Sequence, residues 1–324
     1  MKQMVRNLGF SLVMGMVVPY LFLSFGVTLL GRYRAQAVPA ETVQTEPPLP
    51  KTVSIPVRLR MGADLVKEMD MDTYLVGVVL AEMPASFEME ALKAQSCVAR
   101  TYARKAYVTG GKHGDGSVCM EPSCCQGYTA EEDYLAAGGT LDAVDKIRFA
   151  VQATTGCVLT YGGELIEATY FSCSGGRTED AVAVWGTEFP YLQAVDSPGE
   201  EQASHYTDTK FFSASEFARA LELSLTGDPA AWLGPVTYTE GGGVHTIRIG
   251  GETFQGTQLR SLLGLRSTAI SISADAAGIT VTTKGYGHRV GMSQYGADAM
   301  ALAGSNWEEI LRHYYAGTEI SKLS

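Results

Sequence analysis

The chain carries little positive charge. Its 324 residues include 25 Lys and Arg against 35 Asp and Glu, which gives a formal net charge of −10. Because binding to nucleic acid depends mainly on Lys and Arg contacts to phosphate, this balance argues against a nucleic-acid partner. Charged residues make up only 19% of the chain, whereas 46% of the residues are hydrophobic. This composition is typical of a globular protein with a buried core.

Several motifs of common active sites are also missing. The stretch GYGHRVGMSQYGA, which begins at Gly285, lacks the phosphate-loop pattern, and its glycines do not have the dinucleotide-binding spacing. Ser174 does not lie in the G-x-S-x-G turn that presents a nucleophilic serine. The cysteine-rich region has no H-E-x-x-H metal pair. No organic cofactor is therefore expected.

One long segment near the N-terminus has no charge at all. Residues Leu8–Leu30 are uncharged, and Lys2 and Arg6 precede them. A run of this length is long enough to cross the hydrocarbon core of a bilayer as a single helix. The positive end before the first apolar span tends to stay in the cytoplasm, so the rest of the chain should be exported. The sequence thus predicts a membrane anchor with a short cytoplasmic tail in residues 1–34.

The alternative to an anchor is a cleaved signal peptide. Residues 35–37 have the small-x-small form of a cleavage site, although the apolar run exceeds the usual length of about 7–15 residues. Residues 35–51 are rich in Pro, Thr and Glu, as expected for an extended, solvated linker. A single folded region is then predicted for residues 52–324.

The folded region mixes β-hairpin and helical patterns. Alternating apolar residues predict a strand in Thr52–Arg60, and β-rich runs around Gly-Gly pairs predict hairpins in Cys157–Ser172 and His245–Phe254. Ala269–Gly285 predicts a further strand pair. Helical patterns cover residues 72–83, 87–107, 140–154, 214–224, 293–303 and 307–316. Hairpins with interspersed helices, without regular strand–helix alternation, favour an α+β fold.

The first predicted helix ends at an unexpected carboxylate. Asp72 suits the N-cap, and an apolar stripe follows at Tyr74, Leu75, Val78 and Val79. The next position on that stripe is Glu82. Pro84 disfavours helical geometry at Met83, so the helix should stop there. Glu82 is therefore predicted on the buried side of a helix C-terminus.

Such a position suits acid–base chemistry. Partial burial and the negative end of the helix dipole both disfavour an anion, so they favour a protonated carboxyl group. A carboxylic acid that keeps its proton near neutral pH can act as a general acid. The alternative is a side chain that turns outward, or that pairs with Arg100 or Lys93.

Long motifs in this chain resemble one family. The stretch YLVGVVLAEMPASFEMEALKAQSCVARTYA (Tyr74–Ala103) resembles the signature of the stage II sporulation protein D family. Tyr170–Pro198 and Gly285–Ile320 are similar to two further blocks of that family, and Gly256–Thr268 fits a weaker fourth block. The similarity spans roughly residues 52–320 in the family's order.

The resemblance implies an activity. It implies a lytic transglycosylase that cleaves the bond between N-acetylmuramic acid and N-acetylglucosamine in peptidoglycan and forms a 1,6-anhydro end. Glu82 matches the family's catalytic acid/base. The resemblance further implies glycan strands stripped of stem peptides as substrate, and stage II sporulation proteins P and M as partners. The expected location is the engulfing mother-cell membrane, with the catalytic domain outside the cytoplasm and facing the forespore.

The glycine-rich motifs supply candidates for substrate binding. Glycines permit close backbone approach to a ligand, and hydroxyl, amide and imidazole groups can hold sugar substituents. The candidates are Tyr170, Ser174, Gly175, Gly176, His288, Gly291, Ser293, Gln294 and Tyr295. Aromatic side chains at Trp185, Tyr191 and Tyr286 can stack on sugar rings or belong to the core. For a second carboxylate the nearest candidates are Glu167, Glu179 and Asp196, which suit solvated positions equally well.

A cysteine-rich stretch supplies a candidate metal site. HGDGSVCMEPSCCQGY contains Cys119 and Cys124, at the spacing at which some members of the family hold zinc with a Cys and a His. The second ligand of that pair would here be a thiol, with Cys125 and His113 as additional candidates. Thiolate and imidazole groups favour a structural zinc, and a disulfide is the alternative in an exported domain.

Two functions of other classes fit parts of the pattern. A glycan-binding scaffold that recruits a wall amidase would keep the aromatic and glycine-rich motifs without needing an acid at Glu82. A zinc amidase or peptidase would need an open metal site beside a general base, which suits the cysteine-rich stretch less well than a structural ion does.

Overall fold

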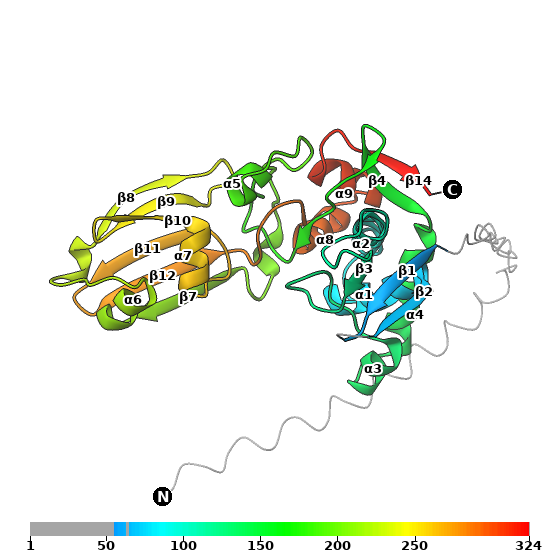
Figure 1. Ribbon diagram of the computed structural model, residues 1–324, viewed down its shortest axis with the longest axis horizontal. Helices are drawn as coiled ribbons and strands as arrows, with labels where there is room; N and C mark the ends of the chain where they lie inside the picture. The colour runs from blue at the N-terminus through cyan, green and yellow to red at the C-terminus, as the bar shows by residue number, and fades with distance from the viewer. Residues whose placement is uncertain (1–54, 63–64, 324) are drawn as a thin grey trace, which may run out of the picture. The chain divides into compact units, whose positions relative to one another are not determined.

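The computed structural model describes residues 55–62 and 65–323 (Figure 1). The predicted membrane anchor and linker lie outside these residues. Within them, no helix combines the length and the apolar character that a bilayer span requires.

The described residues form a mixed α+β structure with small sheets, as predicted. The helices are α1 (Met71–Glu82), α2 (Met89–Thr109), α3 (Glu131–Ala136), α4 (Leu141–Ala153), α5 (Ala181–Trp185), α6 (Ala214–Ala220), α7 (Gly256–Leu262), α8 (Gln294–Leu302) and α9 (Trp307–Tyr314). The strands are β1 (Pro56–Arg60), β2 (Val66–Asp70), β3 (Ser117–Cys119), β4 (Cys157–Tyr161), β5 (Glu164–Leu165), β6 (Tyr170–Phe171), β7 (Thr207–Phe212), β8 (Leu233–Tyr238), β9 (Val244–Ile249), β10 (Glu252–Gln255), β11 (Ala269–Asp275), β12 (Gly278–Lys284), β13 (Met292–Ser293) and β14 (Glu319–Lys322).

Helix α2 forms the centre of the larger of two hydrophobic cores. It packs against α1, α4, α8, α9 and β4. Many of its inward positions are small residues, such as Ala91, Ala94 and Cys97, which are fully buried. Small side chains allow neighbouring elements to approach closely, and the close-packed interior that results holds α1 rigidly. The β4–β5 hairpin forms around Gly162 and Gly163 as predicted and adds β14 at its other edge.

The N-cap of helix α1 lies two residues earlier than predicted. Asp70 is the N-cap, and its carboxylate accepts hydrogen bonds from the backbone N–H groups of Asp72 and Thr73 at 2.9 and 3.3 Å. The prediction of Asp72 as the cap was wrong because both aspartates suit a helix start by sequence. Asp72 instead lies in the first turn and forms an ion pair with the buried Arg100 at 3.0 Å. This pair fixes α1 to α2.

The segment of residues 207–284 has its own smaller core. It contains two three-stranded sheets of order β10-β9-β8 and β11-β12-β7. The β9–β10 and β11–β12 hairpins match the predicted strand pairs, with the first turn at Gly250 and Gly251. Phe217, Ile247 and Leu259 are fully buried between the sheets and the helices α6 and α7.

Two short strands bring distant motifs together. β6 and β13 pair in parallel, with Met292 opposite Tyr170 and Ser293 opposite Phe171. At Gly291 φ is +83°, and a Cβ atom would lie 2.2 Å from the carbonyl oxygen of Thr169. Only glycine allows the two backbones to approach so closely here. The pairing places the Tyr170 and Gly285 motifs next to one another, which the sequence alone does not show.

Candidate active site

Glu82 ends α1, as the periodicity predicts. The stripe residues Tyr74, Leu75, Val78 and Val79 are fully buried, and Glu82 itself is half-buried. Met83 leaves the helix with φ −128° and ψ 140°, the extended conformation that a following proline favours. The carboxylate is therefore held at a rigid helix end, where one side remains accessible.

No cation pairs with Glu82 among the described residues. Arg100 pairs with Asp72, and Lys93 pairs with Glu90 at 2.7 Å, so neither alternative partner is available. The carboxylate Oε1 instead accepts a hydrogen bond from the backbone N–H of Gly127 at 2.5 Å. A Cβ atom on residue 127 would lie 3.0 Å from the same oxygen, so any larger residue here would displace the carboxylate slightly.

A chain of hydrogen bonds supports the tyrosine beside Glu82. The Tyr170 hydroxyl donates to the Gln126 side-chain oxygen at 3.2 Å, and the Gln126 amide group donates to the Tyr74 hydroxyl at 3.0 Å. Burial, followed by the neighbouring Glu82 charge, raises the pKa of Tyr170 well above its ordinary value. Tyr170 is therefore a neutral hydrogen-bond donor at any physiological pH.

Glu82 and Tyr170 line a cavity of about 770 Å³. Of the other predicted substrate-binding residues, His288 and Gln294 also line it. Trp185 and Tyr286 contribute aromatic side chains that are 41% and 47% exposed, so their faces remain available to a ligand. Tyr191 is buried and accepts a hydrogen bond from the Glu167 N–H, so it belongs to the core. The volume lies in the usual range of small-ligand sites.

His288 contributes a neutral ring to this cavity. It lies between Phe171 and Trp185, with ring centroids 5.6 and 5.3 Å away. Its Nδ1 accepts a hydrogen bond from the backbone N–H of Val290 at 3.1 Å, which leaves the proton on Nε2. Burial, followed by the charge of Arg260, lowers the pKa of His288 to about 4. The ring is therefore uncharged near neutral pH.

Six of the nine predicted substrate-binding residues do not line the cavity. Ser174, Gly175 and Ser293 direct hydrogen-bond donors to the buried carboxylate of Glu200. Gly291 lies against the Thr169 backbone, and the Tyr295 ring packs edge-on against Phe87 and His205. Gly176 donates its backbone N–H to the Ser174 hydroxyl at 3.0 Å. The geometry points to structural roles for all six residues.

The three candidates for a second carboxylate have separate environments. Glu179 is buried and pairs with Arg289 at 3.0 Å, and Asp196 is exposed and pairs with Arg177. Only Glu167 lines the cavity, where Lys105 neutralises it at 2.6 Å. Glu82 is therefore the one carboxylate of the cavity lining that has no cationic partner among the described residues.

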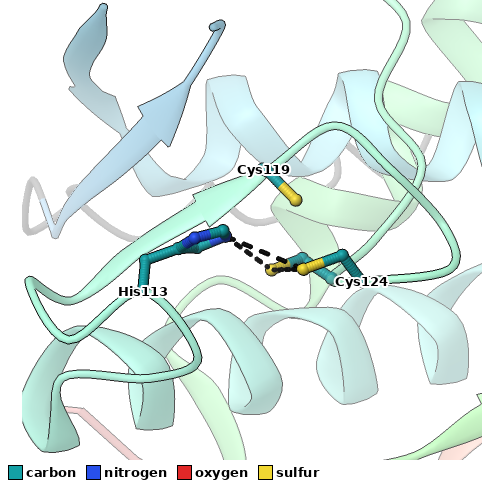
Figure 2. A group of neighbouring side chains, drawn as sticks. His113, Cys119 and Cys124 are labelled. Atoms are coloured by element: carbon teal, nitrogen blue, oxygen red, sulfur yellow. Dashed lines mark hydrogen bonds between the residues drawn. The ribbon is translucent and has the colours of Figure 1, made fainter. Parts of the chain in front are cut away.

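The cysteine-rich stretch forms a compact cluster. Figure 2 shows His113, Cys119 and Cys124 with their side chains directed toward one another. Together with Cys125, their ligand atoms all lie within 4.8 Å of one another. All six cysteines, each among the described residues, have free thiols. Burial would raise the pKa of Cys119, but hydrogen bonds, the largest from the Glu121 backbone and His113, lower it to about 7.

This cluster satisfies the donor chemistry of a structural zinc ion. Three thiols and one imidazole are a known tetrahedral ligand set for Zn²⁺. The cluster directly precedes Gln126, which contacts Tyr74 and Tyr170, and Gly127, whose N–H donates to the Glu82 carboxylate. Farther along the same segment, the Thr129 N–H donates to the carbonyl of Gly77 in α1 at 3.0 Å. The cluster therefore anchors the segment that lies along α1.

Comparisons with known proteins identify the family. The family model SpoIID, described as stage II sporulation protein, matches residues 60–161. The chain is 40% identical over 288 residues to stage II sporulation protein D of Bacillus subtilis (strain 168), covering 87% of this chain and 82% of that protein. It is 39% identical over 288 residues to stage II sporulation protein D of Bacillus amyloliquefaciens, covering 87% and 83%. The chain belongs to the stage II sporulation protein D family, as its motifs predicted.

A more distant relative carries another name. The amidase enhancer of Bacillus subtilis (strain 168) is 29% identical over 300 residues, which cover 76% of this chain and 40% of that protein. The match therefore includes most of this chain but less than half of the amidase enhancer.

Proposed function

We propose that this protein is a lytic transglycosylase that cleaves peptidoglycan glycan strands, with Glu82 as the single catalytic acid and base. One observation carries the proposal most strongly. The Glu82 carboxylate lines a cavity of about 770 Å³, and no cation neutralises it among the described residues. A group in this position can change its protonation state during a reaction, as general acid–base catalysis requires.

The proposed reaction has two proton transfers through the same group. Protonated Glu82 gives its proton to the glycosidic oxygen as that bond breaks at the anomeric carbon of muramic acid. The carboxylate then takes the proton of the sugar's own O6 hydroxyl as O6 bonds to the anomeric carbon. The product is a 1,6-anhydro end, and no water is consumed. Ordinary glycoside hydrolysis uses an opposed pair of carboxylates, whereas this route needs only one.

The neighbouring residues have supporting roles in this mechanism. The Gly127 N–H holds Oε1 of Glu82, which leaves the second oxygen for proton transfer. Tyr170 is a neutral donor beside the carboxylate, and His288 offers a neutral ring with its proton on Nε2. Trp185 and Tyr286 provide exposed aromatic faces on which sugar rings can stack.

The test is the chemical identity of the product. Full-length protein in detergent is incubated with amidase-stripped glycan, and the products are analysed by mass spectrometry. We expect anhydro-muramic ends from the wild type and none from Glu82→Gln. Reducing ends would instead identify a hydrolase, and released stem peptides from intact peptidoglycan would identify an amidase.

A second candidate function is a glycan-binding scaffold that recruits a wall amidase. The name of one relative, amidase enhancer, favours it. In this case neither the wild type nor Glu82→Gln would cleave glycan, and both would increase the turnover of an added amidase equally. Glycan binding by both proteins, measured by co-sedimentation, completes this test.

Zinc is proposed as a structural ion. His113, Cys119, Cys124 and Cys125 would hold it, and it would supply a rigid attachment for the segment that reaches Glu82. Elemental analysis of purified protein should find about one zinc per chain, as a closed tetrahedral site requires. Cys119→Ser should lower the zinc content, and protein that contains an intact thiol cluster without metal would contradict the proposal.

The cellular setting is proposed from the sequence. The protein would be anchored by its N-terminal helix in the engulfing mother-cell membrane, with the catalytic domain facing the forespore, and would act together with stage II sporulation proteins P and M. Protease digestion of intact protoplasts should degrade the catalytic domain, and crosslinking during sporulation should capture the two partners. Protection of the domain from protease would contradict this location.

A further inference from the structure

The cavity that contains Glu82 also contains positive charge without an acidic partner. The charged side chains in its lining are Glu82, Glu167, Lys112 and Arg260. Glu167 is neutralised by Lys105, which does not line the cavity. Among the described residues, neither Lys112 nor Arg260 forms an ion pair; the Lys112 amino group donates only to the Cys124 carbonyl.

Arg260 is the more informative of these two cations. It lies in the last turn of α7, is half-buried, and its guanidinium has no hydrogen-bond or ion-pair partner among the described residues. The nearby Arg266, in contrast, pairs with Asp208 at 3.4 Å and lies over the Tyr286 ring. Burial lowers the pKa of Arg260 because its charge is incompletely solvated. An anionic ligand would compensate for the lost solvation.

A role in helix stability does not account for this arrangement. Arginine at a helix C-terminus interacts favourably with the helix dipole while its side chain remains in solvent. Arg219 occupies the equivalent position in the last turn of α6, where it is exposed and does not line the cavity. Arg260 instead directs its charge into a cavity, close enough to His288 to help keep that ring neutral.

The overall charge of the protein makes this local excess more significant. The chain has a net charge of −10, which as a whole disfavours anions. A cavity with two unpaired cations attracts an anionic ligand against that background. The guanidinium group has a planar array of donors that matches a carboxylate in a bidentate arrangement.

We propose that Arg260, with Lys112 at the rim, forms a carboxylate subsite that recognises the free lactyl carboxylate of a muramic acid unit. This inference rests on the proposed glycan-cleaving function and names the feature of the substrate that is selected. The lactyl group is an amide while a stem peptide is attached and becomes a carboxylate when the peptide is removed. Arg260 is then a specificity-determining residue for stripped strands.

The test compares two glycans that differ in this one charge. Stripped glycan oligosaccharides are used as prepared, or with their lactyl carboxylates converted to neutral methylamides. Binding to full-length protein in detergent is measured by calorimetry in the Glu82→Gln background, so that no substrate is consumed. Charge removal from the ligand should weaken binding about 10-fold, the effect of one charge-assisted hydrogen bond.

The variants identify the residue that recognises the lactyl carboxylate. Arg260→Gln should bind stripped glycan about 10-fold more weakly and bind the methylamide as the parent does, because the two changes remove the same interaction. Arg260→Lys should retain part of the preference, and Arg219→Gln, the matched control, should retain all of it. Equal weakening of both glycans by Arg260→Gln would overturn the proposal, as would equal binding of both by the parent.

A peptide-bearing strand separates the two sources of carboxylate. In one outcome the peptide-bearing strand binds as tightly as the stripped glycan, and Arg260→Gln weakens the binding of both ligands. Arg260 then recognises a stem-peptide carboxylate, and the lactyl assignment is overturned. Product analysis with residue 82 intact keeps this proposal distinct from the proposed function. Charge-dependent binding without anhydro product would refute the activity alone, whereas anhydro product without charge dependence would refute the subsite alone.

Discussion

Glu82 and Glu200 are glutamates with opposite surroundings, and the contrast separates the proposed catalytic carboxylate from a structural one. Glu200 is 1% exposed, and its two oxygens accept hydrogen bonds from Ser174, Gly175, Ser197 and Ser293. Glu82 is half-buried at a cavity wall and receives one hydrogen bond from a backbone N–H of the described residues, that of Gly127. A carboxylate surrounded by donors is fixed, whereas one with an open side can exchange a proton with a ligand.

The largest expected effect is on catalysis at Glu82. Glu82→Gln should lower kcat about 1,000-fold, within the range for loss of a general acid and base. Because this substitution keeps the size of the side chain, the free energy of unfolding should change little. The measurement is anhydro-muramic product per unit time together with chemical denaturation. A variant that unfolds at a lower denaturant concentration than the wild type would show that Glu82, like Glu200, has a structural role.

The reciprocal change at Glu200 should affect stability. Glu200→Gln places an amide NH₂ group against hydroxyl and N–H donors, and we expect it to lower the free energy of unfolding by about 2–4 kcal/mol. Urea denaturation of the full-length variant measures this loss. Unchanged stability would show that the donors around Glu200 rearrange freely, and that its polar shell does not hold the Ser174 turn.

His288 should make stability depend on pH. Its pKa is lowered to about 4 in the folded protein from an ordinary value of 6.5, so between these values the unfolded chain binds more protons. Stability should therefore fall as the pH drops from about 6.5 to about 4, by up to about 3 kcal/mol. Denaturation curves of the wild type and His288→Gln over this range isolate the effect. Parallel curves for the two proteins would exclude it.

The smallest expected effect concerns the position of Glu82. In Gly127→Ala the new methyl group would lie 3.0 Å from Oε1, so the carboxylate must shift by a few tenths of an ångström. We expect kcat to fall about 10-fold, since a displacement of 1 Å costs about 100-fold. KM should change less than kcat. A rise in KM with unchanged kcat would instead assign Gly127 to substrate binding.

The sequence predicted the local features of the site better than its long-range contacts. The position of Glu82 follows from the apolar stripe of α1 and from Pro84, which act within a few residues. The hydrogen bond from Gly127 joins residues 45 positions apart, and no local pattern indicates it. Arg260 lies on α7, a helix that the sequence pattern did not predict.

The glycine- and serine-rich motifs show a different limit. Ser174, Gly175 and Ser293 have the donor groups that a sugar needs, and they use those groups for Glu200 instead. A protein carboxylate and a polar ligand attract the same side chains, so residue type alone does not distinguish the two roles. Burial decides between them, and burial depends on the tertiary fold.

The parallel pairing of β6 with β13 has a consequence for the order of folding. Tyr170 and Met292 are separated by the residues that include the whole smaller core. Closing so long a loop is entropically unfavourable while the intervening chain is unfolded, and the cost falls once that chain has collapsed into its own unit. We therefore expect the cavity to be among the last parts of the molecule to form. Chain termination within residues 207–284 would then yield a protein that has α1 and Glu82 but no place to bind a glycan.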